Sequence, residues 1–366
     1  MSEVCIAGFG EVMLRLSPQG NLRLQQVLPG DLTATFGGGE ANVCVSVAQF
    51  GVKSRYLTAL PKNPIAEALV TEMRGLGVDT SKILRMDKGR LGIYFAEAGA
   101  NQRGSTVVYD RAQSSISLAK PQDYDWDSML DGVTWLHITG ITPALSEAAF
   151  RSTVTIAERA SEKGIKISCD LNFRKKLWKW SEGTSPKELA AKCMSEIVRF
   201  VDVIVANEED AYDVFGIAAS GTSVESGSLN VDAYTEVAQK LSARFPKAMK
   251  IAITLRESHS ANHNNWGAML YDVPAAKSYL APLDADGQYK PYEIHNIVDR
   301  IGGGDSFSAG LVYALSSTSY AEPSKALAFA VAASCLKHSI YGDYNFCSVD
   351  EVESLMGGNA SGRVKR

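Results

Sequence analysis

The sequence lacks the features that would place the chain outside the ordinary globular proteins. No uninterrupted apolar run reaches the length of a membrane-spanning helix. Acidic and basic residues nearly balance, so the net charge of −4 gives no reason to expect nucleic acid or an anionic membrane as a partner. With 366 residues, 45% of them hydrophobic, the chain is long enough for one large α/β domain or two smaller ones.

Closely spaced cysteines and the pattern of a signal peptide are also absent. The six cysteines are scattered, without a Cys-x-x-Cys pair or a zinc-type Cys/His spacing, which excludes a disulfide scaffold and a zinc finger. The first residues lack the basic segment and long apolar core of a signal peptide. We therefore expect a cytoplasmic protein with reduced, mostly buried thiols. Residues 217–230 and the tail 356–366 read as loops without chemistry.

A complete dinucleotide fingerprint is missing as well. Gly8-Phe9-Gly10 follows an apolar strand pattern and opens like that motif, but its third glycine is absent. Residues 14–18 then alternate like a strand, where the motif requires a helix. These two departures argue against the dehydrogenase interpretation.

What is present is a regular alternation of strand and helix patterns. We predict strands at 56–60, 133–138, 165–170, 201–206 and 251–255. Helices are predicted to start at Asn63-Pro64 and near 208 and 232, and to span 146–163 and 185–199. This order predicts a parallel sheet covered by helices on both faces. In such sheets ligands bind beyond the carboxyl ends of the strands.

A different pattern occupies residues 90–115. Segments 91–97 and 105–111 are joined by the turn-rich 99–104 and predict a β-hairpin. Together with residues 11–36, which alternate and turn, this hairpin is expected to form a small sheet that stands off the main body as a lid. The main domain then comprises 1–10, 37–89 and 116–355.

Two triple-glycine turns each precede an apolar helix pattern. Gly302-Gly303-Gly304 leads into Asp305, and a helix starting there points unpaired amides at a bound anion. An acid at an anion site is explained if Asp305 takes a proton from a substrate hydroxyl, although a plain helix cap is the alternative. The other turn, 37–39, precedes Asn42 and is either simple helix packing or a site where the backbone approaches a polyol.

Polar residues follow the predicted strands at 170–174, 207–210 and 254–257. Each group alone is typical of a cap or a solvated turn. Because the carboxyl ends of parallel strands meet at one edge, the groups are expected to form a polar crescent there.

The two glycine turns, with their flanking residues 37–42 and 299–307, resemble the two signatures of the ribokinase-like (PfkB) carbohydrate kinases. Segments 109–111, 170–178 and 337–345 are most similar to the 2-keto-3-deoxygluconate kinases of that family. The resemblance implies a three-layer α/β/α fold with a mostly parallel central sheet and a small β lid. It also implies transfer of a phosphoryl group from ATP to a sugar hydroxyl with Mg²⁺, and allows a monovalent cation.

The resemblance also implies a role for each site residue. The expected catalytic residues are Asp305 as base, with Gly302, Gly303 and Gly304 as anion hole. The sugar is expected at Gly37, Gly38, Asn42, Tyr94, Tyr109, Arg111 and Arg174; the nucleotide at Asn207, Thr254, Arg256, Gly302 and Gly304; and Mg²⁺, through water, at Glu209 or Asp210. The acids after Asn207 are Glu208, Glu209 and Asp210, so the acid that organises Mg²⁺ stays open.

Local chemistry favours an acidic sugar. Arg111 and Arg174 offer charge-assisted contacts to a carboxylate, and burying two guanidinium groups in a sugar site without an anion is costly. The alternative is that Arg174 pairs with Asp170 or a neighbouring acid. His259 and His263 have an i, i+4 spacing, but their Asn-rich surroundings predict a loop and argue against a metal site.

The sequence therefore predicts an ATP-dependent kinase of 2-keto-3-deoxygluconate that forms 2-keto-3-deoxy-6-phosphogluconate. A fructokinase or another ketose kinase is the nearest alternative, and a non-catalytic sugar or nucleotide sensor is a more distant one. Exposed edges of the lid strands are expected to pair with a second copy of the chain.

Overall fold

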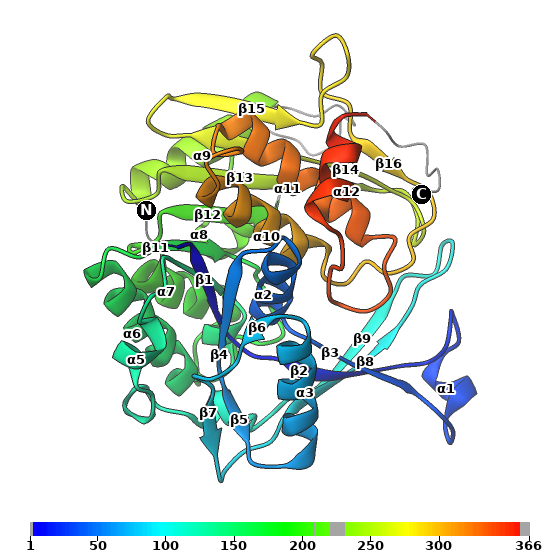
Figure 1. Ribbon diagram of the computed structural model, residues 1–366, viewed down its shortest axis with the longest axis vertical. Coiled ribbons are helices and arrows are strands. Elements are labelled where there is room, and N and C mark those ends of the chain that lie inside the picture. The colour runs from blue at the N-terminus through cyan, green and yellow to red at the C-terminus, as the bar shows by residue number, and fades with distance from the viewer. Residues whose placement is uncertain (1–2, 208, 220–230, 359–366) are drawn as a thin grey trace.

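A ten-stranded sheet forms the centre of the protein in the computed structural model, which describes residues 3–207, 209–219 and 231–358 (Figure 1). Seven neighbouring strands, β6, β4, β1, β10, β11, β12 and β13, run parallel to one another. Strand β14 runs antiparallel to its neighbours β13, β15 and β16. In sheet order they are β15 (Lys277–Ala281), β14 (Asn264–Asp272), β13 (Lys250–Ser258), β12 (Val203–Asn207), β11 (Lys166–Asp170), β10 (Trp135–Thr139), β1 (Cys5–Phe9), β4 (Lys53–Leu57) and β6 (Val78–Asp79), with β16 (Tyr292–Ile294) paired to β14.

Helices cover both faces of this sheet, because its strands are apolar on both sides. In β1, Ile6 packs into one core and its neighbour Ala7 into the other. One layer holds α4 (Ser115–Leu118), α5 (Trp126–Leu130), α6 (Glu147–Glu162), α7 (Pro186–Val198), α8 (Asp210–Phe215) and α9 (Val231–Arg244); the other holds α2 (Gly39–Gln49), α3 (Pro64–Gly75), α10 (Gly303–Ser316), α11 (Pro323–Lys337) and α12 (Val349–Met356). The predicted three-layer architecture is confirmed.

Several helices begin where the sequence carries capping residues. The Asn63 side chain accepts from the Ala66 amide at 2.9 Å, and Pro64 occupies the first turn of α3. Ser146 caps α6 in the same way, and Ser185 forms a capping box with Glu188 at the start of α7. These local bonds fix the ends of the helices that follow the predicted strands.

The lid is a separate four-stranded sheet that projects from the main body at the lower right of Figure 1. Its order is β3 (Thr33–Gly37), β2 (Met13–Ser17), β8 (Gly92–Glu97) and β9 (Thr106–Asp110), with α1 (Leu24–Val27) between β2 and β3. The strands β8 and β9 form the predicted hairpin. Segments 11–36 and 90–115, distant in sequence, thus pair in one sheet.

The structure also departs from the sequence pattern at one strand. The apolar run 56–60, predicted as one strand, is divided between β4 and β5 (Ala59–Pro61), since the chain leaves the main sheet there to pair with β7 (Leu84–Met86). No helix among the described residues combines the length and the apolar character needed to cross a membrane. All six cysteines are free, and all but Cys335 are buried. Residues 220–230 and 359–366 of the predicted loop and tail lie outside the described residues.

Candidate active site

A cavity of about 470 Å³ lies at the carboxyl edge of the parallel strands, beneath the lid. Residues at the ends of β11, β12 and β13 line its floor, and β2, β8 and β9 contribute its lid side. Among the described residues, every one that the sequence singled out for the site lines this one cavity: Gly37, Gly38, Asn42, Tyr94, Tyr109, Arg111, Arg174, Asn207, Glu209, Asp210, Thr254, Arg256, Gly302, Gly303, Gly304 and Asp305. Glu208 lies outside the described residues.

The glycine turn at 302–304 opens α10, as its sequence predicts. Gly302 is the helix N-cap with φ of +84°, a left-handed conformation that favours glycine, and a Cβ there would lie 2.1 Å from the Asp343 carbonyl oxygen. A Cβ on Gly303 would lie 3.0 Å from the His338 ring, so even an alanine would be tightly packed there. Gly304 has open space instead. The first amides of α10 therefore face the cavity without side chains in the way.

Asp305 links this turn to the other glycine turn through Asn42. The Asn42 Nδ2 donates to Asp305 Oδ2 at 2.6 Å, and Asn42 Oδ1 accepts from the Gly38 amide at 3.1 Å. Burial raises the pKa of Asp305 to about 6, while the Asn42 hydrogen bond opposes that rise. An acid with this pKa is ionised near neutral pH and can accept a proton.

Glu40, at the start of α2, has a structural role next to the 37–39 glycine turn. Its Oε1 accepts from the Thr139 amide at 3.1 Å and from the Thr142 hydroxyl at 3.2 Å, and burial raises the pKa of Glu40 to about 7. A Cβ on Gly10 would lie 2.1 Å from this carboxyl group. The Gly8-Phe9-Gly10 motif thus lets β1 approach α2 closely, a purpose unrelated to nucleotides.

The two arginines that are predicted to bind the sugar differ in their surroundings. Arg111 Nε donates to Glu11 Oε2 at 2.7 Å, and this buried pair lies beside the Tyr109 ring, 5.1 Å from the Arg111 Cζ. The argument that both arginines need a substrate anion is therefore wrong for Arg111, whose charge Glu11 already balances. Arg174 is exposed to the cavity and donates only to the Phe173 carbonyl at 3.3 Å among the contacts of the described residues. Its alternative pairing with Asp170 does not occur among them.

Carboxylates gather at the ends of β11 and β12. Asp210 Oδ1 accepts from the Phe173 amide at 3.0 Å and its Oδ2 from the Asn207 amide at 2.9 Å. Burial, followed by repulsion from Asp210, raises the pKa of Asp170 well above its usual value. Glu209 also lines the cavity. In the described part of the chain no group of three or more His, Cys, Asp or Glu side chains is placed to hold a metal ion by itself.

A model of the pfkB family of carbohydrate kinases matches residues 5–257. The chain belongs to this family. Its structure is similar to the crystal structure of 2-dehydro-3-deoxygluconokinase from Thermotoga maritima, with 41% identity, a TM-score of 0.86 and coverage of 97% of this chain and 100% of that one. It is also 30% identical to a 2-dehydro-3-deoxygalactonokinase from Haloferax volcanii over 97% of both chains. A fructokinase from Xylella fastidiosa, crystallised with ATP, shares the fold at 18% identity and a TM-score of 0.73, over 98% of this chain and 99% of that one.

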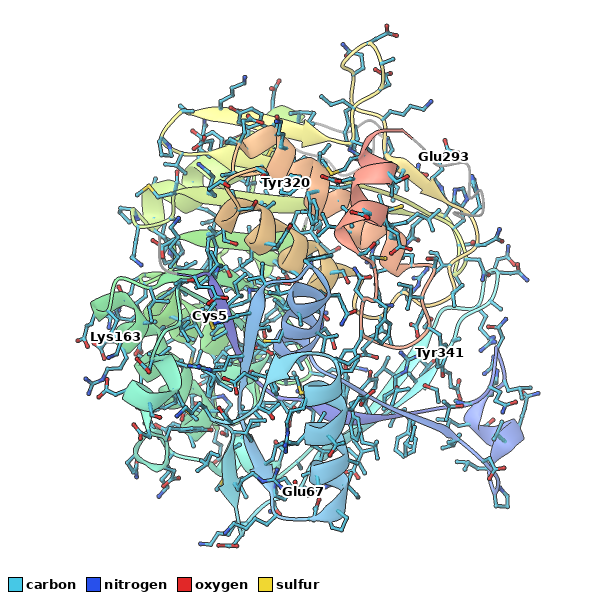
Figure 2. The ribbon with its side chains drawn as sticks, viewed as in Figure 1. Cys5, Glu67, Lys163, Glu293, Tyr320 and Tyr341 are labelled. Atoms are coloured by element: carbon cyan, nitrogen blue, oxygen red, sulfur yellow. The ribbon has the colours of Figure 1, made fainter. Side chains whose placement is uncertain are left out.

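Sequence reasoning on this carbohydrate kinase missed a buried charge network below the glycine turn. Arg15 Nη2 lies 2.7 Å from Asp299 Oδ2 and its Nη1 lies 2.9 Å from Asp343 Oδ1, while the Tyr94 hydroxyl donates to Asp343 at 2.6 Å. The Arg15 guanidinium also lies 5.3 Å from the ring of Tyr341, which is labelled beside the lid in Figure 2. Nothing near Arg15 in the sequence marks this role, since its partners lie about 300 positions away along the chain.

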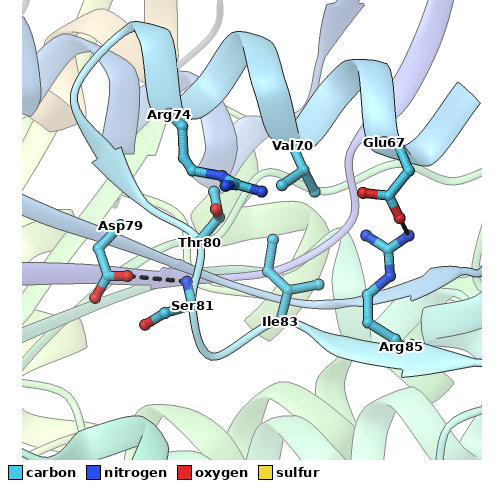
Figure 3. Close-up of a pocket in the computed structure, with 8 residues that line it drawn as sticks. All are labelled: Glu67, Val70, Arg74, Asp79, Thr80, Ser81, Ile83 and Arg85. Atoms are coloured by element: carbon cyan, nitrogen blue, oxygen red, sulfur yellow. Dashed lines mark hydrogen bonds and ion pairs between the residues drawn. The ribbon is translucent and has the colours of Figure 1, made fainter.

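A second cavity, of about 490 Å³, lies between α3 and the 79–85 segment, away from the kinase site (Figure 3). Its Arg85 is paired with Glu67, and its Asp79 accepts from the Ser81 amide at 2.9 Å. None of the predicted site residues lines it. The rings of His259, His263 and His295, which directly flank β13, β14 and β16, lie in tilted contact with centroids 4.5 and 4.4 Å apart.

Proposed function

We propose that this carbohydrate kinase transfers the γ-phosphoryl group of ATP to the 6-hydroxyl of 2-keto-3-deoxygluconate. The observation that carries the proposal is the meeting of Asp305, the first amides of α10 and the unpaired Arg174 in one cavity under the lid. The similarity to the 2-dehydro-3-deoxygluconokinase of Thermotoga maritima supports the choice of sugar. The similarity to the 2-dehydro-3-deoxygalactonokinase of Haloferax volcanii makes the galactonate analogue the second candidate.

In the proposed reaction, the sugar hydroxyl oxygen forms a bond to the γ-phosphorus as the bond from that phosphorus to the ADP oxygen breaks. Asp305 accepts the hydroxyl proton, and Asn42 holds its carboxylate in a fixed orientation. The amides of Gly303 and Gly304, at the positive end of α10, stabilise the negative charge on the transferring group. The lid, with Tyr94 and Tyr109 facing the cavity, keeps water from competing with the sugar.

Arg174 is the residue that we propose for the sugar carboxylate. Its guanidinium reaches the cavity and has no ion pair among the described residues, so an acidic sugar supplies the missing charge. A neutral ketohexose would leave Arg174 with only the longer-range charges of Asp170, Asp210 and Asp305 and no direct ion-pair partner, which favours a sugar acid. An intact Asp305 and glycine turn argue against a silent sensor.

The donors at the ends of β11 and β12 fit Mg²⁺ held through water and nucleotide phosphates. Both oxygens of Asp210 already accept backbone amides, so we propose that Glu209 takes the larger part in orienting the water shell. Mg²⁺ would neutralise phosphate charge next to Asp170 and Asp210. A monovalent cation does not fit the acids below the glycine turn, because Arg15 pairs with both Asp299 and Asp343 and the charge of Lys337 also acts on both.

The lid also supports a proposed homo-oligomer. Its outer face carries apolar side chains, among them Leu16, Phe95 and Val108, and Val108 is 49% exposed. Exposed apolar sheet surface of this kind is typical of association sites. We propose that a second copy of the chain covers it.

Measuring ADP release with 2-keto-3-deoxygluconate, 2-keto-3-deoxygalactonate and fructose tests the proposed function. We expect kcat/KM to be highest for one of the two sugar acids. Faster turnover of fructose would exclude the acid as substrate, and no turnover on any sugar would exclude catalysis.

A further inference from the structure

Arg300 is a cavity residue to which neither the sequence nor the resemblance assigns a role. Only Ile301 separates it from the glycine turn, and it lines the same cavity as Asp305 and Gly304. Its Nη2 donates to the Ser260 carbonyl at 3.2 Å and to the Ala261 carbonyl at 2.8 Å. These carbonyls orient the guanidinium but do not balance its charge.

The neighbouring acid is not available to Arg300. Asp299 Oδ1 accepts from the Ile301 amide at 3.1 Å, and its Oδ2 accepts from the Gly342 amide at 3.1 Å and pairs with Arg15 at 2.7 Å. Across residues 3–207, 209–219 and 231–358, no carboxylate lies within 4.0 Å of the Arg300 guanidinium, and its buried Nε has no hydrogen-bond partner. Arg300 therefore reaches the cavity with charge and donor capacity unused.

A second arginine lies close to it. Arg256 lines the same cavity, and burial together with the positive charge of Arg256 lowers the pKa of Arg300. Holding two guanidinium groups close together costs free energy because they repel each other. A ligand with several negative charges that binds both groups offsets this cost. Phosphate oxygens meet that requirement, and the amides of α10 beside the arginines are suited to the same ligand.

The loop that holds Arg300 also contacts the lid. The Ala261 amide donates to the Asn101 carbonyl at 2.7 Å, and the Asn101 amide donates to Asn262 Oδ1 at 2.7 Å. Asn101 belongs to the turn between β8 and β9. Residues 260–262 thus connect the tip of the lid to the Arg300 side chain. If the lid opens, this loop loses two hydrogen bonds.

We propose that Arg300 binds the polyphosphate of the nucleotide, and that the contact between Asn101 of the lid and the 260–262 loop holds Arg300 in its binding position. The inference deepens the proposed function, since it identifies a nucleotide ligand in the same site. In this arrangement a closed lid and a bound nucleotide stabilise each other.

ADP binding measured by calorimetry, without sugar and without turnover, tests the proposal. Arg300→Gln should weaken ADP binding roughly 10- to 100-fold, as expected for the loss of charge-assisted hydrogen bonds. The matched control is Arg244→Gln, because Arg244 also donates to a carbonyl, that of Phe215 at 3.2 Å, but lies on α9 and does not line the cavity. Its ADP affinity should equal that of the wild type. Unchanged ADP affinity in Arg300→Gln overturns the proposal.

Arg300→Lys covers the case in which the glutamine variant does not fold. A lysine keeps the charge but not the forked geometry. The ADP affinity of Arg300→Lys should therefore be lower than that of the Arg244→Gln control, but reduced by a smaller factor than we expect for Arg300→Gln. If the glutamine variant does not fold, wild-type ADP affinity in a folded Arg300→Lys variant overturns the proposal, because it counts against a directional contact.

The role of the lid has its own readout. Asn262→Ala should raise the KM for ATP about threefold or more at saturating sugar, with the KM for sugar less affected. In the Arg300→Gln background the same substitution should have no further effect on nucleotide binding, since Asn262 acts through Arg300. Additive effects of the two substitutions overturn the lid connection. Because the ADP measurements use no sugar, they stand or fall apart from the sugar panel that tests the proposed function.

Discussion

The Asn42–Asp305 hydrogen bond offers the sharpest test of the proposed base. Burial raises the pKa of Asp305 to about 6, and the 2.6 Å bond from Asn42 Nδ2 lowers it from a still higher value. A hydrogen bond to a charged group contributes roughly 1.5–3 kcal/mol, and one pKa unit corresponds to about 1.36 kcal/mol. Asn42→Ala should therefore raise the pKa of Asp305 by about 1 to 2 units.

The consequence appears on the acidic side of the pH profile. A base is active only when ionised, so kcat falls as pH drops through the pKa of Asp305. In the wild type that fall should be centred near pH 6, and in Asn42→Ala it should move to about pH 7 to 8. At pH 9 the kcat values of the two proteins should approach each other, because both carboxylates are then ionised. The assay is kcat at saturating ATP and sugar from pH 5 to 9.

Ser46→Ala provides the control on the same helix. Ser46 is buried in α2 and its hydroxyl donates to the Asn42 carbonyl at 2.9 Å, yet it makes no contact with Asp305. Its pH profile should coincide with that of the wild type. An acidic limb that stays near pH 6 in Asn42→Ala would refute the assignment of that limb to Asp305.

Four further predictions follow from the same contacts. Asp305→Asn should lower kcat by roughly 100-fold or more while ADP affinity by calorimetry stays within a few-fold, and an unchanged kcat would exclude Asp305 as the base. Arg174→Ala should raise the KM for the sugar acid at least about tenfold and the KM for ATP far less, since it removes a charge-assisted contact; equal effects would count against the carboxylate role. Arg15→Met should lower the free energy of unfolding in urea by about 3–5 kcal/mol, because it leaves two buried carboxylates unpaired. Lys53→Met, at an exposed ion pair, should lower it by only about 0–1 kcal/mol. Similar losses in the two variants would contradict this interpretation. Val108→Glu should shift the oligomer toward monomer in light scattering, and an unaltered mass would place the interface elsewhere.

The sequence alone determined the parts of this protein that depend on local pattern. Strand and helix periodicity predicted the three-layer fold, and the caps at Asn63, Ser146 and Ser185 marked helix starts, because both signals act over a few neighbouring residues. The glycine turns were visible for the same reason. The antiparallel strands at 264–294 were not predicted, because their pairing depends on partners distant along the chain.

Only the tertiary structure decided which charges are available in the site. Arg111 and Arg174 look equivalent in the sequence, yet Glu11 lies against the first and no acid lies against the second in the described part of the chain. Asp299 and Arg300 are adjacent, yet the acid is bonded to Arg15 and the arginine is held by the 260–262 loop. The free energy of a buried charge depends on the atoms within a few ångströms of it, and folding brings those atoms from every part of the chain.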